Sequence, residues 1–141
     1  MIIQQLSVFL ENRAGRLTEV TEALGDHGIN ISALCIAETS DFGILRMVVS
    51  DVSKAQEVLR NRGFSISVTQ VICLSIPNRP GAVNKALRIL SQASISIEYM
   101  YAFAVGPSAF VMIRTTDIEQ SISVLLENRL TLVPASALHD H

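Results

Sequence analysis

The chain contains few of the residues on which most enzymatic and metal chemistry depends. Its 141 residues include three histidines, two cysteines and no tryptophan. The zinc-protease, P-loop, nucleophile-elbow and dinucleotide-binding motifs are all missing, and no Ser-His-Asp or Cys-His set stands out. We therefore expect no catalytic residue, no metal site and no cofactor. A small enzyme stays open as an alternative, because function depends on sites rather than on folds.

Long apolar runs and blocks of like charge are also missing. No stretch approaches the ~20 apolar residues that span a bilayer, and residues 1–10 lack the basic start of a signal peptide. The net charge is −2 without a basic cluster, which argues against binding to nucleic acids or anionic membranes. Cys35 and Cys73 lie in apolar runs, as buried thiols do in a reducing compartment. These features predict a cytoplasmic protein that binds neither nucleic acid nor membrane.

What the sequence has in abundance is apolar side chains. They make up 49% of the residues, whereas only 17% are charged, and the mean hydropathy is +0.39. A domain of this size can bury only a limited share of its surface. The surplus predicts that part of the apolar surface contacts another subunit, as in a homodimer.

The sequence repeats itself after 66 positions without a gap. The segment Asn12-Arg13-Ala14-Gly15 aligns with Asn78-Arg79-Pro80-Gly81, and Asp51 aligns with Asp117. Self-similarity at one fixed shift indicates duplication of a structural unit. We expect two copies, over residues 1–70 and 71–141.

Each copy has the element order strand, helix, strand, strand, helix, strand. Apolar residues alternate in the expected strands and recur every three or four residues in the expected helices. The strands of the first and second copy cover residues 6–10, 29–37, 44–49 and 64–71, and residues 72–76, 95–104, 110–115 and 130–133. Asp51 and Asp117 are N-cap candidates for the second helices. The order predicts an α+β fold with two ferredoxin-like βαββαβ modules, each an antiparallel four-stranded sheet with both helices on one face.

The two copies join without a linker, because residues 65–72 contain neither Gly nor Pro. We therefore expect rigidly joined modules with a site at their junction. The third strands, residues 44–49 and 110–113, are apolar on both faces, although helices cover only one face of such a sheet. This pattern predicts that another module or subunit covers the second face. The alternative is a strand that is merely rich in apolar residues.

A turn with the pattern Asn-Arg-(Ala/Pro)-Gly joins the first strand to the first helix in each copy. The first amides of a helix lack intrahelical partners and lie at the positive end of its dipole, so they can bind an anion. Gly15 and Gly81 allow a ligand to approach the backbone closely, while Asn12 and Asn78 offer donors and acceptors to a zwitterion. The alternative is ordinary turn chemistry, in which the Asn bonds to its own backbone.

Further polar residues are candidates for the same site. Arg13 and Arg79 could contact a carboxylate, or they could be exposed turn residues. Asn30 and Ser96, early in the second strands, could reach a ligand held by a neighbouring copy. Glu38 has no acidic counterpart in the second copy, and we interpret it as a surface or edge residue.

The turn, the repeat and the element order together resemble the ACT-domain family, specifically its small stand-alone tandem proteins. The second copy carries the closer motif, IPNRPGAV at residues 76–83, similar to the family's strand-(Asp/Asn)-x-Pro-Gly-x-Leu/Val signature. In the first copy, Ala14 replaces the proline. The resemblance covers nearly the whole chain.

The resemblance implies both a fold and a function. ACT modules pair side by side or face to face and bind amino acids where two modules meet. The loop after the first strand, the start of the first helix and the second strand of a neighbour form the pocket. Such modules regulate enzymes such as phosphoglycerate dehydrogenase, aspartokinase and acetohydroxyacid synthase. Carried over by position, the resemblance implies binding roles for Asn12, Gly15, Asn30, Asn78, Gly81 and Ser96.

We therefore expect an amino-acid-binding regulatory or sensor protein that forms a homodimer and acts on an amino-acid biosynthetic enzyme carried by a separate chain. One alternative is a non-catalytic regulatory subunit that docks on an enzyme of amino-acid metabolism without a ligand of its own. A single-stranded RNA binder shares the element order, but it needs basic surroundings and exposed aromatic residues. The third strands offer only Phe110.

Overall fold

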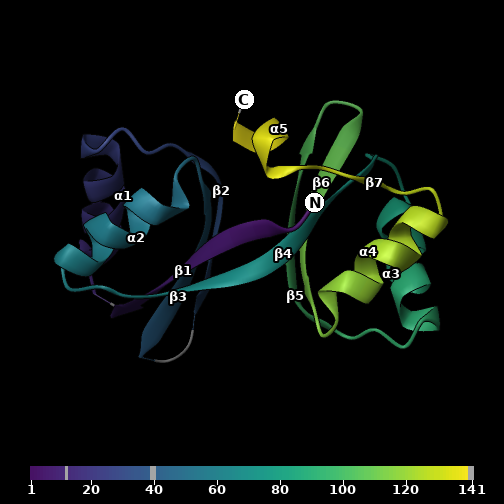
Figure 1. Ribbon diagram of the computed structural model, residues 1–141, viewed down its shortest axis with the longest axis horizontal. Coiled ribbons are helices and arrows are strands. Elements are labelled where there is room, and N and C mark those ends of the chain that lie inside the picture. Colours follow the sequence, from purple (N-terminus) through teal and green to yellow (C-terminus); the bar gives the residue numbers. More distant parts are fainter. Residues whose placement is uncertain (12, 39–40, 140–141) are drawn as a thin grey trace. The chain divides into compact units, whose positions relative to one another are not determined.

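A computed structural model describes residues 1–11, 13–38 and 41–139 of the chain. Two compact units are present (Figure 1). Module 1 is built from Gln4–Thr69, and module 2 from Gln70–Leu138 together with Met1–Ile3. Each module has the order βαββαβ, which confirms the predicted α+β fold class.

The two modules share strand β4 and otherwise repeat the same elements. Module 1 contains β1 (Ile3–Glu11), α1 (Arg16–Asp26), β2 (Ile31–Glu38), β3 (Phe42–Val49), α2 (Val52–Asn61) and the first part of β4 (Ser65–Pro77). Module 2 contains the rest of β4, α3 (Ala82–Gln92), β5 (Ile97–Val105), β6 (Ser108–Thr115), α4 (Ile118–Glu127), β7 (Thr131–Leu132) and α5 (Ala135–His139). The strand order is β2-β3-β1-β4 in module 1 and β5-β6-β4-β7 in module 2.

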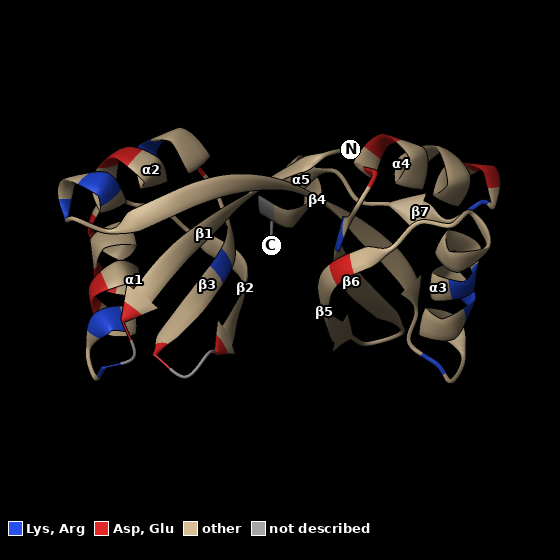
Figure 2. Ribbon diagram, turned by 90° about the horizontal axis from the view of Figure 1, so that it is seen from below, with Lys and Arg blue, Asp and Glu red and all other residues tan. Residues whose placement is uncertain are grey.

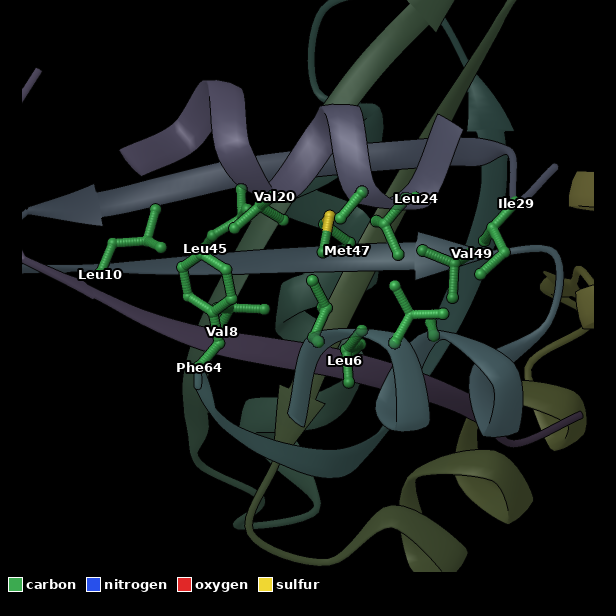
Figure 3. Packing of buried hydrophobic residues seen from close by; sticks show 14 residues of the cluster. Leu6, Val8, Leu10, Val20, Leu24, Ile29, Leu45, Met47, Val49 and Phe64 are labelled. Carbon is green, nitrogen blue, oxygen red and sulfur yellow. The ribbon is translucent and has the colours of Figure 1, made fainter. Parts of the chain in front are cut away.

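The core of module 1 lies between its sheet and its two helices (Figure 3). Leu6 and Val8 of β1 pair with Met47 and Leu45 of β3, so these side chains share one face of the sheet. Figure 3 labels the core residues Leu6, Val8, Leu10, Val20, Leu24, Ile29, Leu45, Met47, Val49 and Phe64. Each fully buried aliphatic side chain contributes about 1.5–3 kcal/mol, so this cluster is the main source of the module's stability.

Module 2 has its own core at the matching positions. Ile72 and Leu74 of β4 occupy the places of Leu6 and Val8, and Leu90 of α3 occupies the place of Leu24. These three residues of module 2 are fully buried. The repeated apolar pattern therefore encodes two similar cores.

The second helix of each module begins at the predicted N-cap. Asp51 accepts a hydrogen bond from the Lys54 amide at 3.0 Å, and Asp117 accepts one from the Gln120 amide at 3.0 Å. Such a bond satisfies one of the amides that a helix start leaves without a partner. The backbone angles of the two caps agree closely, with φ −143° and −142° and ψ 94° in both.

The third strand of module 1 is buried to different extents on its two faces. Leu45, Met47 and Val49 point into the core next to the helices. On the other face Val48 is 1% exposed, whereas Ile44 is half-buried. Phe9, which pairs with Ile44, is 46% exposed. The second face is therefore covered near Val48 and open near Phe9.

The end of module 2 differs from the prediction. A strand was expected over residues 130–133, but β7 comprises only Thr131–Leu132. The Val133 amide still donates to the Cys73 carbonyl at 2.8 Å. Pro134 then ends the ladder because it has no amide hydrogen, and the short helix α5, which was not predicted, follows. Among the described residues, no helix combines the length and apolar composition of a transmembrane span.

Candidate functional site

The turn between the first strand and the first helix has the same backbone geometry in both modules. Gly15 precedes α1 with φ 91° and ψ −13°, and Gly81 precedes α3 with φ 86° and ψ −11°. These left-handed angles are costly for residues that carry a Cβ. No atom lies within 4 Å of a Cβ built at either glycine, so the backbone here is open to close approach.

The two helix starts beside these glycines carry no side-chain cap among the described residues. The amides at the start of α1 and α3 lie at the positive end of the helix dipole, which favours an anion. The first amide of each helix donates within the turn, from Arg16 to the Arg13 carbonyl at 3.5 Å and from Ala82 to the Arg79 carbonyl at 3.2 Å. In module 2 the amide of the Asn78 side chain donates to the Gly106 carbonyl at 3.1 Å. Asn78 thus ties the turn to the β5–β6 connection and leaves its side-chain oxygen as an acceptor.

A hollow of about 310 Å³ lies beside the turn of module 1. The end of β1, the start of α1 and the end of β2 form its walls. Its lining residues are Leu10, Glu11, Arg13, Arg16, Leu17, Ile36, Glu38 and Gly43. Side chains of both charges therefore surround the space next to the helix start, as a zwitterionic ligand requires.

Arg16 is the most confined charged residue in this hollow, with its side chain 15% exposed. Its Nη1 lies 2.6 Å from Oε2 of Glu19, and its guanidinium carbon lies 4.4 Å from the centre of the Phe64 ring. Its Nε is buried and has no hydrogen-bond partner within the described part of the chain. Buried donors are nearly always paired, so the Nε–H of Arg16 calls for an acceptor that the described chain does not supply.

The other charged residues of the hollow are more exposed. Nε of Arg13 lies 3.4 Å from Oε2 of Glu11, and both side chains are about 60% exposed, at 61% and 59%. Such a pair contributes little to stability. Glu38, at the end of β2, pairs with Gly43 of β3, which also faces Leu10 of β1. The sheet register therefore places Glu38 beside the turn.

The matching hollow of module 2 measures about 240 Å³. It is lined by Ile76, Pro77, Arg79, Pro80, Gly81, Ala82, Lys85 and Leu130. Its charged lining residues, Arg79 and Lys85, are both cationic. In Figure 2, acidic and basic segments meet at the turn end of module 1, whereas the turn end of module 2 carries basic segments without acidic ones.

Asn30 and Ser96 lie at the opposite end of their modules from the turns. The Asn30 amide donates to Oγ of Ser50 at 2.9 Å, and the Ser96 amide donates to Oγ1 of Thr116 at 3.3 Å. These contacts are at the start of β2 and β5, whereas the turns lie beside the strand ends. The structure therefore does not bring Asn30 or Ser96 to the hollow of its own module, and a contact with a ligand of a neighbouring copy stays a prediction.

Arg13 is the predicted site residue that lines the hollow of module 1, and the predicted set lacked its charged neighbours Arg16 and Glu38. The repeat gives no signal for Arg16, because Ala82 stands at its matching position. Glu38 was interpreted as a surface or edge residue, but its edge position is part of the hollow's wall. Asn12, which was predicted to contact the ligand, lies outside the described residues.

Comparison with known proteins connects this geometry to a family. The family model of the ACT domain pair matches residues 1–140. The chain belongs to the ACT-domain family. This finding confirms the resemblance inferred from the turn motif and the repeat. No curated protein matches the chain.

Several solved structures are similar to this ACT pair. Protein BT0572 from Bacteroides thetaiotaomicron is 50% identical, with a TM-score of 0.96 over 100% of this chain and 98% of that one. The ligand-free regulatory subunit of aspartate kinase from Thermus thermophilus is 14% identical, with a TM-score of 0.66 over 90% and 94% of the chains. E. coli aspartokinase III in complex with lysine and aspartate is 17% identical, with a TM-score of 0.57 over 91% of this chain and 31% of that one. The two aspartate kinases share the fold with this ACT pair.

Proposed function

We propose that this ACT pair is a non-enzymatic regulatory protein that binds an amino acid at its strand-to-helix turns. The observation that carries the proposal is the hollow beside Gly15, where a helix start to which no described side chain gives a cap meets side chains of both charges. The amides at the start of α1 would hold the carboxylate of the ligand. The fold shared with E. coli aspartokinase III, which was crystallised with lysine and aspartate, supports this class of ligand.

We further propose that a second copy of the chain completes the site. Strand β2 is at the edge of the sheet of module 1, and its side chains Leu34 and Ile36 are 48% and 47% exposed. Exposed apolar residues on an edge strand favour association with another chain. Ile36 also lines the hollow, so a homodimer that covers β2 would close the ligand in. Light scattering after size-exclusion chromatography should give twice the mass of one chain.

A thermal-shift screen with each of the twenty L-amino acids tests the proposed ligand class. A ligand present at ten times its Kd adds about 1.4 kcal/mol, which raises the Tm of a chain of this size by roughly 3–6 °C. The carboxamide of each active amino acid is the control, because it lacks the carboxylate. If no amino acid changes the Tm at millimolar concentration, the proposal is wrong.

The second candidate is a regulatory subunit that docks on an enzyme of amino-acid metabolism without its own ligand. The fold shared with the regulatory subunit of aspartate kinase from Thermus thermophilus favours this alternative. Under it, the chain would copurify with the enzyme while its Tm stayed constant in the amino-acid screen. We place the protein in the cytoplasm under either candidate, since both cysteines are free thiols, as is usual in a reducing compartment.

A further inference from the structure

We infer that the two turns are not equivalent and that module 1 alone holds the α-amino acid. In this site Arg16 binds the ligand carboxylate through its Nε–Nη2 edge, and Glu38 accepts the ligand ammonium group. The inference rests on the proposed amino-acid binding and names the residues that make it specific. It also assigns no amino-acid site to module 2.

The surroundings of Arg16 pair one nitrogen of its guanidinium and leave the buried Nε without an acceptor among the described residues. Oε2 of Glu19 lies 2.6 Å from Nη1 of Arg16, and the centre of the Phe64 ring lies 4.4 Å from the guanidinium carbon. These two contacts hold the planar group in one orientation before any ligand arrives. Residues 1–11, 13–38 and 41–139 supply no hydrogen-bond partner to the buried Nε. Since a guanidinium binds a carboxylate best through two parallel N–H groups, the Nε–Nη2 edge is suited to the carboxylate of an amino acid.

Glu38 supplies the opposite charge in the same hollow. An ionised carboxylate offers about four acceptor positions, so it can receive an ammonium group in addition to a partner within the protein. Glu38 at the end of β2 and Arg16 at the start of α1 thus come from different elements around one space, as the two charges of an α-amino acid require.

Module 2 carries a different residue at each position that matches one of these groups. The residues that match Phe64, Arg16 and Glu19 are Leu130, Ala82 and Lys85, and the residue that matches Glu38 is Ala104. Leu130, Ala82 and Lys85 line the hollow of module 2. The guanidinium of that hollow belongs to Arg79 in the turn rather than to the first residue of α3, and none of its lining residues is a carboxylate that could receive an ammonium group.

Isothermal titration calorimetry with the twenty L-amino acids tests the inference, followed by the carboxamide and N-acetyl derivatives of the tightest binder. The wild type should bind one amino acid per chain. Arg16→Gln should weaken binding roughly ten- to hundredfold, the usual loss for a hydrogen bond to a charged group. It should also remove the preference for the acid over its carboxamide, while Glu38→Gln should remove the preference for the free amine over the N-acetyl derivative.

Two control variants show whether a loss of binding comes from the site itself or from the removal of a charged side chain elsewhere. Arg88→Gln removes an arginine that donates to Asn84 on α3, and Glu22→Gln removes an exposed carboxylate on α1. Both should bind as the wild type does. Because Arg16 packs on Phe64, its substitution can also disturb folding, so the Nε–Hε resonance of Arg16 in the wild type gives a second readout. The amino acid should move this NMR signal, and Arg16→Lys should remove it from the spectrum.

The outcomes distinguish this inference from the proposed function. Binding that persists in Arg16→Gln, two equal sites per chain, or a greater loss in Arg79→Gln than in Arg16→Gln would overturn the inference while leaving amino-acid binding intact. An unmoved Arg16 resonance at saturating amino acid would do the same. If no amino acid binds the wild type, both the proposed function and the inference are wrong.

Discussion

The two modules of the chain have kept the same backbone while their turns have acquired different chemistry. The glycines before the first helices differ by only 5° in φ, at 91° and 86°. The backbone is alike even at a position where only module 1 has a glycine. Ser94 has φ 58° at the position that matches Gly28, which has φ 69°. In contrast, Glu19 of module 1 corresponds to Lys85 of module 2, which reverses the charge beside the helix start.

This difference indicates which positions of the duplicated unit must stay similar in both copies and which can change. Core positions and helix caps must agree in both copies, because each module has to bury its own apolar surface. Exposed charges of the turn hollow, such as the Arg13–Glu11 pair, contribute little to stability, so they can differ between the copies without loss of the fold. The different charges of the two hollows therefore point to unequal binding by two similar folds.

The largest effects should come from the matched core residues Leu24 and Leu90, which are both fully buried. Leu24→Ala and Leu90→Ala should each lower the free energy of unfolding by about 2–5 kcal/mol, since each leaves a cavity in a packed core. Hydrogen exchange should report the greatest loss of amide protection in the module that carries the substitution. Equal losses in both modules for either variant would contradict separate cores.

Substitution of the turn glycines should have the next largest effect. Gly15→Ala and Gly81→Ala should each cost about 1–2 kcal/mol, because a Cβ disfavours the left-handed backbone. No steric contact adds to this cost, since a Cβ at either position meets no atom within 4 Å. Urea denaturation measures the change, and Asn, which tolerates this conformation, is the matched control. A cost that differs strongly between the modules would show that their turns are not alike.

Removal of the second-helix caps should have a smaller effect. Asp51→Ala and Asp117→Ala should each lower the free energy of unfolding by about 1 kcal/mol, because each variant loses one bond to a helix amide. The two values should agree closely, given the equal cap distances of 3.0 Å. Asp→Asn at each position keeps an acceptor and should recover most of the loss.

The pH dependence that the Cys73 thiol contributes to the free energy of unfolding should be confined to alkaline pH. Burial raises the pKa of this thiol from 9.0 to about 11. The unfolded chain therefore loses this proton first, so the thiol's contribution to stability is complete below pH 9 and is lost as the pH rises toward 11. Cys73→Ser, which copies Ser7 of module 1, should reduce the fall in stability between pH 9 and 10.5 in urea titrations. An unchanged slope would show that the thiol does not titrate as proposed.

The fold could be predicted almost completely from the sequence, because its signals are local or periodic. Alternating apolar residues marked the strands, and Asp51 and Asp117 marked two helix starts that the structure confirms. The short length of β7 and the presence of α5 were not predicted. Residues 130–133 have an apolar pattern that favours a strand, but the pattern does not fix where pairing stops before Pro134.

The candidate site was less predictable, because its residues meet only through tertiary contacts. Arg16 lies on α1, while the ring that it contacts belongs to Phe64 before β4. Glu38 reaches the turn through the register of β2 with β3. Nothing in the local sequence of either residue indicates these neighbours. Asn30 is the opposite case. Its position early in β2 suggested a binding role, but the topology of module 1 places it away from the turn of that module.

A crystal structure grown with a mixture of the twenty L-amino acids would test the central claim most directly. We expect density for one amino acid beside Gly15, with its carboxylate against the α1 amides and Nε of Arg16 and its ammonium group toward Glu38. The turn at Gly81 should hold no amino acid. Density at Gly81 alone, or at neither turn under conditions that saturate binding in solution, would contradict the account.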